Sequence, residues 1–386
     1  MPAGGCGDRG GAGSRAASRR AGGGRARGRQ GGHRAHGVGR GGARGVHRHR
    51  RRAHRGRGRA GAGDLPCRRR RWRRVHRGHR DPARGPVPGA LRRHPRRLEH
   101  VFGDRIAELA QDADGVDVVF AGGNRRRFDL VVGADGLHSE LRAMVFGPHE
   151  RFLRRLGHML AFYSVPNEFG LDRWLLEYQD QESGRYALLR PIQDATRAMA
   201  MFYSASADFD VDHRDVAAQK RLLRERMAGL GWLAPDILAH LDDTPDFYLD
   251  QVAQVVMDRW SSGRVGLLGD AAFSSSPMSG QGTGLALVGA YLAGELAAAE
   301  WDPDAGFARY EARMRSFVEA NQEIGRLNAR SRDVPGPETE PRPDFTGEWF
   351  TELVGRAING VELPDYAGVP DSAAPAGSPI TSSAKL

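Results

Sequence analysis

Cysteine is almost missing from this chain of 386 residues. The only two, Cys6 and Cys67, both fall within its first hundred residues. A disulfide framework or a thiolate metal cage is therefore excluded from the rest of the chain, and we expect no metal site. This cysteine usage is typical of the reducing cytoplasm, where we expect the protein to act.

Long apolar runs are also missing. The most apolar stretch, residues 285–299, is interrupted by Glu295 and is too short to cross a bilayer. No apolar segment follows the N-terminus in the way that a secretory signal requires. We therefore expect neither a membrane span nor an export signal.

The first hundred residues lack lysine, isoleucine, phenylalanine and tyrosine, and Trp72 is their only aromatic residue. They hold 30 arginines and 24 of the 52 glycines. Such a segment cannot bury enough apolar surface to offset chain entropy, so residues 1–98 are predicted to be low-complexity and disordered. A GC-rich gene read in a shifted frame yields this composition, so we also interpret the segment as mistranslated.

The same hundred residues carry a net charge of +26, whereas the rest of the chain carries −15. Arg-Gly tracts can bind nucleic acid by neutralising phosphates, but such binders interleave aromatic residues for base stacking. We therefore expect no nucleic-acid partner, and an Arg-rich nucleic-acid binder stays as an alternative function. Two G-x-G-x-x-G matches, at residues 37–42 and 56–61, follow no apolar strand and are expected by chance at this glycine content.

From residue 99 the pattern becomes that of a globular protein. Residues 116–120 alternate as a strand, residues 121–124 form a turn, and residues 128–132 form a continuous apolar strand. That strand ends in Gly-Ala-Asp135-Gly136, and Ser139 is placed to cap a short helix. A carboxylate at the end of a buried strand suits binding of a ribose or nucleotide, and an ordinary strand-to-helix corner is the alternative.

The middle of the chain is predicted to be a β-sheet with one or two helices, the helices lying within residues 213–241. The expected strands are residues 159–165, 173–178, 186–191 and 198–204. Strand alternation places Tyr186, Leu188 and Arg190 on one face of their strand, and Met199, Met201 and Tyr203 on one face of the next. Either face could line a pocket, and the alternative is that these side chains are core.

The strongest pattern is an apolar strand, residues 263–268, that ends in Gly269-Asp270. A loop containing Pro277 follows, and then Gly280, Gly282 and Gly284 precede an apolar helix. The backbone N–H groups at such a helix start are open to an anion, and the aspartate can accept from sugar hydroxyls. Glycines that merely permit tight packing are the alternative.

Residues 133–142 read GADGLHSELR, and residues 269–284 read GDAAFSSSPMSGQGTG. Together they resemble the paired Asp-Gly and Gly-Asp motifs of the FAD-dependent aromatic-hydroxylase family, the group A flavoprotein monooxygenases, which includes tetracycline-inactivating enzymes. The order and separation of the two motifs match the family as well. The resemblance covers residues 99–366.

The resemblance implies a set of FAD-binding residues. The Gly269-Asp270 pair would bind the ribityl or phosphate region, and Pro277 would border the isoalloxazine. The helix start at Gly280, Gly282, Thr283 and Gly284 would lie near the pyrophosphate, and Asp135, Gly136 and Arg142 would contact FAD or the docking nicotinamide cofactor. Tyr186, Arg190, Met201 and Tyr203 are the candidate substrate residues.

The resemblance also implies the chemistry. NAD(P)H would reduce FAD, the reduced flavin would add O2 as a C4a-hydroperoxide, and an aromatic or polyketide-like small molecule would be hydroxylated. No side chain need act as a nucleophile, so no catalytic residue is assigned.

Two departures bear on this implied function. Phe273 stands where many relatives carry His or Tyr, and the family's N-terminal glycine loop has no counterpart in residues 1–98. A flavin-free, non-functional relic is therefore a second alternative.

The predicted fold is α/β, with a Rossmann-like FAD-binding domain whose N-terminal part is missing or replaced. Residues 99–154 and 259–330 form the two parts of that domain. Residues 155–258 are an inserted β-sheet substrate domain, and residues 331–386 are a linker, a short helix and a disordered tail.

Overall fold

The computed structural model describes residues 68–71, 98–205, 211–333, 341–366 and 380–384. Most of the Arg/Gly-rich segment, with both chance glycine matches, lies outside the described residues. Within it, Arg68–Arg71 form strand β1, and the disorder predicted for residues 1–98 stays a prediction. The backbone of β1 pairs with β8 (Trp174–Gln179), because an edge strand accepts backbone partners whatever the side chains are.

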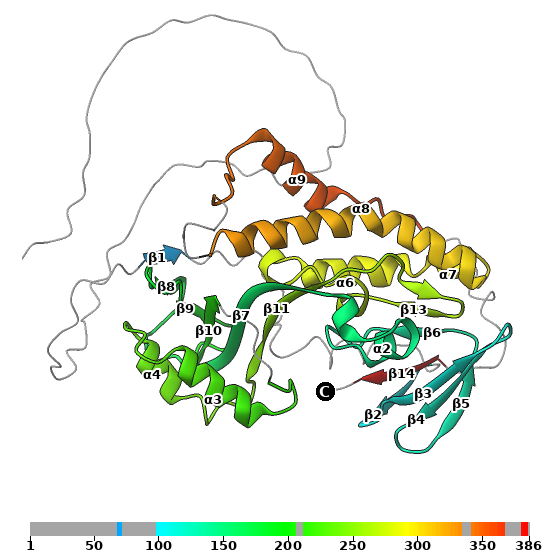
Figure 1. Cartoon of the computed structure of the whole chain (residues 1–386), viewed down its shortest axis with the longest axis horizontal. Helices are drawn as coiled ribbons and strands as arrows, with labels where there is room; N and C mark the ends of the chain where they lie inside the picture. The colour runs from blue at the N-terminus through cyan, green and yellow to red at the C-terminus, as the bar shows by residue number, and fades with distance from the viewer. Residues whose placement is uncertain (1–67, 72–97, 206–210, 334–340, 367–379, 385–386) are drawn as a thin grey trace, which may run out of the picture. The chain divides into compact units, whose positions relative to one another are not determined.

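Three small sheets lie on one side of the described chain in Figure 1, where their strands are drawn in cyan to yellow-green apart from one red strand from the C-terminal end. The first contains β3 (Ile106–Gln111), β4 (Val116–Phe120) and β5 (Arg125–Phe128). The second contains β12 (Ser261–Ser262), β13 (Val265–Leu267) and β6 (Val131–Gly133). The third pairs β14 (Ile380–Ala384) with β2 (Leu98–Phe102).

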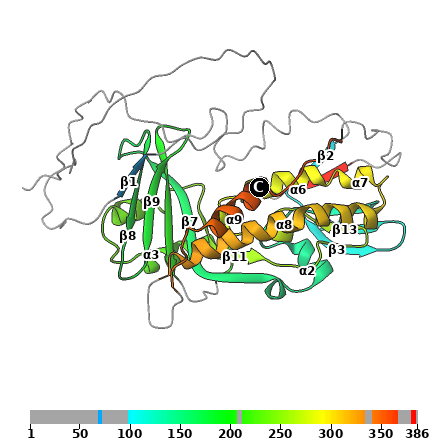
Figure 2. The same cartoon turned by 90° about the horizontal axis from the view of Figure 1, so that it is seen from above.

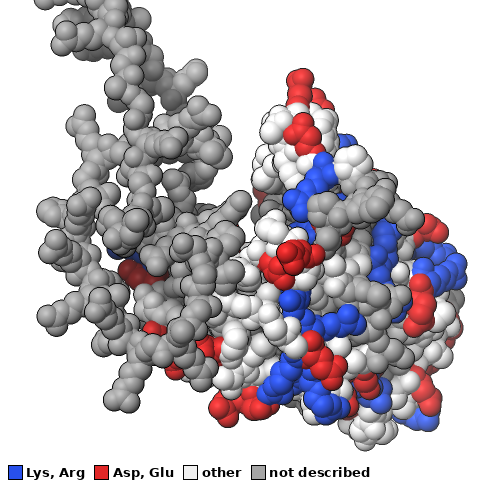
Figure 3. All heavy atoms as spheres, turned by 60° about the vertical axis from the view of Figure 1, so that its left-hand side comes forward, with Lys and Arg blue, Asp and Glu red and all other residues white. Residues whose placement is uncertain are grey.

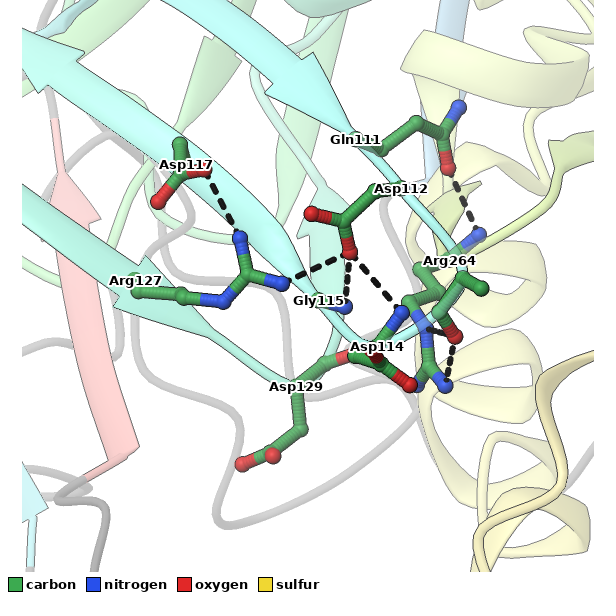
Figure 4. Close-up of polar contacts among 9 residues, drawn as sticks. Gln111, Asp112, Asp114, Gly115, Asp117, Arg127, Asp129 and Arg264 are labelled. Atoms are coloured by element: carbon green, nitrogen blue, oxygen red, sulfur yellow. Dashed lines mark hydrogen bonds and ion pairs between the residues drawn. The ribbon is translucent and has the colours of Figure 1, made fainter.

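The predicted strand over residues 128–132 is wrong as a single strand. Phe128 ends β5, and Val131 begins β6 in a different sheet. Arg264 marks the break, since its guanidinium donates from Nη1 to the carbonyl of Asp129 and from Nε to that of Ala113 (Figure 4). The apolar run of residues 128–132 continues across this corner, which is why the sequence pattern conceals it.

The β3–β4 turn is stabilised by a cluster of charged side chains, which Figure 4 shows. Arg127 pairs with Asp112 at 2.6 Å and with Asp117 at 2.7 Å. The backbone N–H groups of Asp114 and Gly115 both donate to Asp112. These ion pairs are exposed, so they fix the geometry of the turn more than they stabilise the fold.

The largest sheet of the described residues has six antiparallel strands, in the order β1-β8-β9-β10-β7-β11. Its remaining strands are β7 (Leu153–Pro166), β9 (Tyr186–Pro191), β10 (Arg197–Ala205) and β11 (Tyr248–Val255). The predicted strands are confirmed, with β7 longer than expected, but β11 was missed. Helices α3 (Val216–Arg226) and α4 (Ala234–Ala239) cover one face of this sheet, as Figures 1 and 2 show.

Helices follow each of the two glycine motifs. After the first come α2 (Glu140–Phe146), with Ser139 as its predicted N-cap, and the 3-10 helix η2 (His149–Arg151). After the second come α5 (Asp270–Phe273), the 3-10 helix η3 (Pro277–Ser279), α6 (Gly282–Leu292), α7 (Glu295–Ala298), the long α8 (Pro303–Arg330) and α9 (Glu348–Asn359). Within the described ranges, no helix combines the length and the apolar character that crossing a membrane requires.

The buried side chains form two large clusters. One joins β4, β6 and β13 to α5, α6 and α8, with Trp260 and Phe307 among its members. The other lies between the six-stranded sheet and α3–α4, with Tyr163 and Leu223 among its members. The predicted boundary near residue 154 falls between these clusters, whereas Val255 and Met257, just before the predicted boundary at 258, already belong to the first cluster. Both boundaries stay predictions.

Candidate flavin site

Two predicted cofactor aspartates follow two neighbouring strands. β6 and β13 are parallel and adjacent, with Gly133 opposite Leu267, so their carboxyl ends meet at one edge of the sheet. A Cβ atom at Gly133 would lie 2.8 Å from Leu267 Cδ2, which explains the glycine at this close contact. Asp135 follows β6, and Asp270 follows β13. The carboxyl edge of parallel strands is where nucleotide ligands bind in α/β sheets.

Asp135 shapes the start of α2. Its carboxylate accepts a hydrogen bond from Ser139 Oγ at 2.6 Å and another from the backbone N–H of Leu141 at 3.1 Å. Gly136 has a φ of 81°, a left-handed conformation that favours glycine. Asp135 itself is exposed, so a ligand can still reach its carboxylate.

Arg142 lies inside the protein, with no exposed surface. Its guanidinium donates from Nη1 to the carbonyl of Ala271 at 2.9 Å and from Nη2 to that of Leu137 at 2.7 Å. Burial lowers the pKa of Arg142, and the charge of Asp135 opposes that shift. The side chain therefore ties the Asp135 loop to the Asp270 loop, and the direct cofactor contact implied by the resemblance stays a prediction.

Asp270 opens α5, directly after Gly269, which has a φ of 57°. Its carboxylate is exposed to solvent, yet desolvation by the surrounding protein raises its pKa, against a hydrogen bond from Ser274. Hydrogen-bond donors on a bound molecule would stabilise the ionised carboxylate of Asp270.

The loop from Ser274 to Ser279 rests on α8 through a buried amide network. Gln254 on β11 donates from Nε2 to the carbonyls of Ser275 and Gln322, and Gln322 donates from Nε2 to the carbonyl of Val255. Ser276 has a φ of 71°, which a residue other than glycine adopts only when its surroundings impose it. The network therefore holds Pro277 in a fixed position.

The start of α6 fits an anion. Its N-cap, Gln281, makes no side-chain capping bond, so the first backbone N–H groups have no side-chain acceptor. A Cβ atom at Gly280 or Gly282 would meet no atom within 4 Å, and Gly280 has a φ of 69°. An open cradle of N–H groups at the positive end of a helix suits a pyrophosphate, so the residues present fit FAD.

Phe273 is buried against Trp260, with ring centroids 4.7 Å apart. The position where relatives carry a polar ring is therefore part of the core in this chain.

All four candidate substrate residues share one face of the six-stranded sheet. The register pairs Tyr186 with Tyr203 and Met199 with Arg190, and Met201 lies between them. α3 and α4 pack on the opposite face, and Met278, directly after Pro277, packs on this one. The face thus adjoins the loop that is predicted to border the isoalloxazine.

Neighbouring side chains cover the end of this face near Tyr203. Tyr203 is buried, and Arg332 lies over its ring at 5.2 Å and over the ring of Tyr186 at 4.9 Å. His158 stacks on Tyr203 at 4.7 Å, and its Nε2 lies 2.9 Å from Asp333 Oδ1. Tyr203 is therefore a core residue of the face, whereas Tyr186, Arg190 and Met201 are half-buried.

Two residues of the face were missed by sequence reasoning. Phe162 and Tyr248 pair across β7 and β11 and stack with ring centroids 4.6 Å apart. Tyr248 is 37% exposed. Burial and Asp250 raise the pKa of its hydroxyl most, and the charge of Asp270 raises it further. Tyr248 therefore extends the aromatic surface of the face beyond Phe162. Recognising residues 248–255 as an alternating strand would have revealed it.

Comparison with known proteins agrees with this geometry. The family model described as FAD binding domain matches residues 90–323. The chain is 42% identical over 271 residues to the uncharacterized protein MT1298 of Mycobacterium tuberculosis, covering 70% of this chain and 68% of that protein. It is 36% identical over 266 residues to a flavin-dependent monooxygenase of Legionella longbeachae, covering 69% and 68%. The crystal structure of tetracycline destructase Tet(55) superimposes with a TM-score of 0.58 at 37% identity, covering 68% of this chain and 69% of that one.

The fold and the site thus define an FAD-binding α/β protein. This chain belongs to the group A flavoprotein monooxygenase family, and it is an enzyme whose cofactor is FAD. Asp270, the η3 loop and the start of α6 are the described residues that fit the cofactor best.

Proposed function

We propose that this monooxygenase uses NAD(P)H and O2 to hydroxylate a planar aromatic or polyketide-like small molecule. The observation that carries the proposal is the packing of Met278, from the η3 loop of the candidate flavin site, on the aromatic sheet face that bears Phe162 and Tyr203. A flat molecule held on that face would lie beside the cofactor. The cysteine-poor composition of this chain supports a location in the reducing cytoplasm, where NAD(P)H is available.

Each part of the site has a task in this reaction. Asp270 and the N-terminus of α6 would hold the sugar and phosphate parts of FAD, and Met278 and Pro277 would separate the cofactor from water. The bound flavin supplies the redox chemistry and the activation of O2. The protein contributes orientation and a dry, apolar surface, so no nucleophilic side chain is required.

The walls of the face favour a flat, largely apolar substrate with a few polar groups. Phe162, Leu188 and Met201 offer apolar surface, and Arg190 offers cationic nitrogen atoms. Planar rings stack well on such walls, and a charged group at the rim would fix their orientation. The likeness to tetracycline destructases supports a polycyclic phenolic molecule as the first candidate.

Oxygen uptake by the FAD-loaded enzyme tests the proposal. We expect NADPH or NADH oxidation to accelerate when a planar phenol or tetracycline is added, and mass spectrometry to find a product with one added oxygen atom. Phe162→Ala should raise KM, whereas the matched control Tyr163→Phe, on the opposite face of β7, should leave KM unchanged. The proposal fails if the enzyme binds FAD but oxidises neither nicotinamide cofactor.

A further inference from the structure

The sheet face that bears the candidate substrate residues is built in rows that run across its strands. The register places Leu188 opposite Met201 and Met201 opposite Phe162, so these three side chains form an apolar middle row. Tyr186 and Tyr203 lie opposite each other in the next row. Side chains on one face of a strand are two residues apart, or about 7 Å, so the tyrosine row lies within reach of a ring held on the middle row.

Arg332 lies over the tyrosine row. Its guanidinium carbon is 4.9 Å from the ring centre of Tyr186 and 5.2 Å from that of Tyr203. The residue follows the end of α8 and is therefore no part of the sheet. Contact with two ring faces holds a guanidinium in place without using its N–H donors in hydrogen bonds, because the attraction is to the π electrons.

These N–H donors have no other task in the described part of the chain. No described residue accepts a hydrogen bond from the Arg332 side chain. Two acids at this end of the face have other partners. Glu177 accepts from Tyr186 Oη at 2.9 Å, and Asp333 Oδ1 lies 2.9 Å from His158 Nε2. A half-buried cation is ordinarily paired, so this guanidinium is suited to bind an anionic oxygen.

The charge of Arg332 also sets the local potential at Tyr203. Burial is the largest effect on the pKa of Tyr203 and raises it. Of the two neighbouring charges, Arg332 lowers this pKa by more than Asp333 raises it. The potential that these two charges create at the tyrosine row is therefore positive, which favours a negative group beside it.

Arg190 is the other cation of this face, and it lies on the opposite side of the middle row. It is paired with Met199 across the strands, and its Nη2 donates to Met199 Sδ at 3.0 Å. Its guanidinium is thus already engaged within the sheet. Arg332 differs because its contacts leave the donors available to a ligand.

We propose that Arg332 anchors an anionic oxygen of the substrate, a carboxylate, phenolate or enolate carried by a ring that lies on the middle row. This inference rests on the proposed function, and it narrows the planar substrate to one with a negative charge within about 7 Å of that ring. The flat edge of a guanidinium presents parallel donors that match a carboxylate. Arg332 would select the substrate by its charge and take no part in oxygen transfer.

Equilibrium dialysis of the FAD-loaded enzyme, without NAD(P)H, tests the anchor. The probes are 6-hydroxy-2-naphthoate and the neutral 6-hydroxy-2-naphthamide, which share a ring system and a shape but differ in charge. We expect the wild type to bind the naphthoate at least about tenfold more tightly, since hydrogen bonds between charged groups are the stronger ones. Arg332→Gln should remove this preference by raising the Kd of the naphthoate, while the Kd of the naphthamide changes by less than about threefold.

Two further variants separate charge from structure. Arg332→Lys keeps the charge but loses the planar fork, so it should retain part of the preference. Arg330→Gln removes the same charge at the exposed C-terminal end of α8 and should leave both Kd values unchanged. Binding of the naphthamide shows that each variant is folded. In turnover, Arg332→Gln should raise KM for the naphthoate with little change in kcat, because the anchor holds the ground state and the transition state alike.

The anchor is refuted if Arg332→Gln keeps the wild-type preference for the naphthoate. It is also refuted if this variant binds both probes more weakly by the same factor, since Arg332 would then only support the face. A wild type that binds both probes equally refutes the anchor alone, whereas one that binds neither contradicts the planar substrate as well. Failure of the proposed reaction would look different, because NAD(P)H would not be oxidised although the dialysis results still held.

Discussion

Gly325 of α8 lies directly against the backbone carbonyl of Ser275, since a Cβ atom at position 325 would be 2.4 Å from that oxygen. Gln254 Nε2 and Ser276 Oγ would lie 2.9 Å and 3.0 Å from the same Cβ. The long helix therefore supports the loop that leads to Pro277 through backbone contact. A side chain of any size at this position would displace that loop.

Gly325→Ala is expected to destabilise the protein by about 1–3 kcal/mol, the usual cost of overpacking, and to weaken FAD binding. Thermal unfolding and FAD titration measure the two effects. The matched control is Gly355→Ala in α9, where the added Cβ would meet no atom within 4 Å. That change should be neutral or stabilising by up to about 1 kcal/mol, because alanine favours helix interiors. Equal effects from both substitutions would contradict the contact.

Arg142→Ala tests whether this buried residue positions the loops or contacts the cofactor. Removing the guanidinium leaves the carbonyls of Ala271 and Leu137 without their donor, so we expect a loss of about 3 kcal/mol or more. Because the contacts lie within the protein, chemical denaturation should show this loss even before FAD is added. An unchanged apoprotein with greatly weakened FAD binding would instead assign Arg142 to direct contact.

Asp270→Asn is expected to stabilise the apoprotein at neutral pH while it weakens FAD binding. Burial raises the pKa of Asp270 in the folded protein, so its ionisation opposes folding above the ordinary carboxyl pKa. The stability advantage of Asp270→Asn over the wild type should therefore grow as the pH rises through the raised pKa. It should vanish in acid, where Asp270 is protonated in both the folded and the unfolded wild type.

Asp344→Asn is expected to have the opposite effect on stability at neutral pH. Hydrogen bonds from Thr346 lower the pKa of Asp344, so its ionised form favours the folded state. This substitution should slightly lower the melting temperature at neutral pH, and the difference should fade in acid. Parallel pH profiles for the two variants would show that the sign assigned to Asp270 is incorrect.

His158 is expected to make the protein sensitive to mild acid. Burial lowers the pKa of this histidine despite the nearby Asp333, so the neutral ring is favoured in the folded state. Its contribution is present above the ordinary histidine pKa of about 6.5 and is lost as the pH falls toward the lower folded value. His158→Gln should flatten the decline of melting temperature below pH ~6.5. A decline as steep as in the wild type would assign the acid sensitivity to another group.

Local patterns in the sequence predict the two aspartate loops well. The end of each strand before its aspartate, the Ser139 cap and the open glycines before α6 each arise from residues within a few positions of each other, whereas the parallel pairing of β6 with β13 joins distant parts of the chain. The α/β fold and the FAD-binding family are confirmed. The break between β5 and β6 was missed because Arg264, far along the chain, determines where the strand ends.

Contacts between residues far apart in the sequence account for the features of the site that local patterns did not predict. Tyr248 and Phe162, or Gln254 and Gln322, come together only when the sheet and α8 are assembled. A lone tyrosine or glutamine carries no local signal of such a partner. The face that bears Met201 and Arg190 was predicted from strand alternation, but the closed surroundings of Tyr203 depend on Arg332, which follows the end of α8.

The most direct measurement is an FAD titration of the purified protein, followed by flavin fluorescence, with one charge added at the start of α6. Thr283→Glu places a carboxylate in the first turn, where the helix dipole favours it, so folding should be preserved while the phosphates of FAD are repelled. Ala290→Glu, at an exposed position farther along α6, is the control. We expect the wild type and the control to bind one FAD and Thr283→Glu to bind it at least about tenfold more weakly, a loss of about 1.4 kcal/mol. Equal FAD affinity in all three proteins would contradict cofactor binding at this helix.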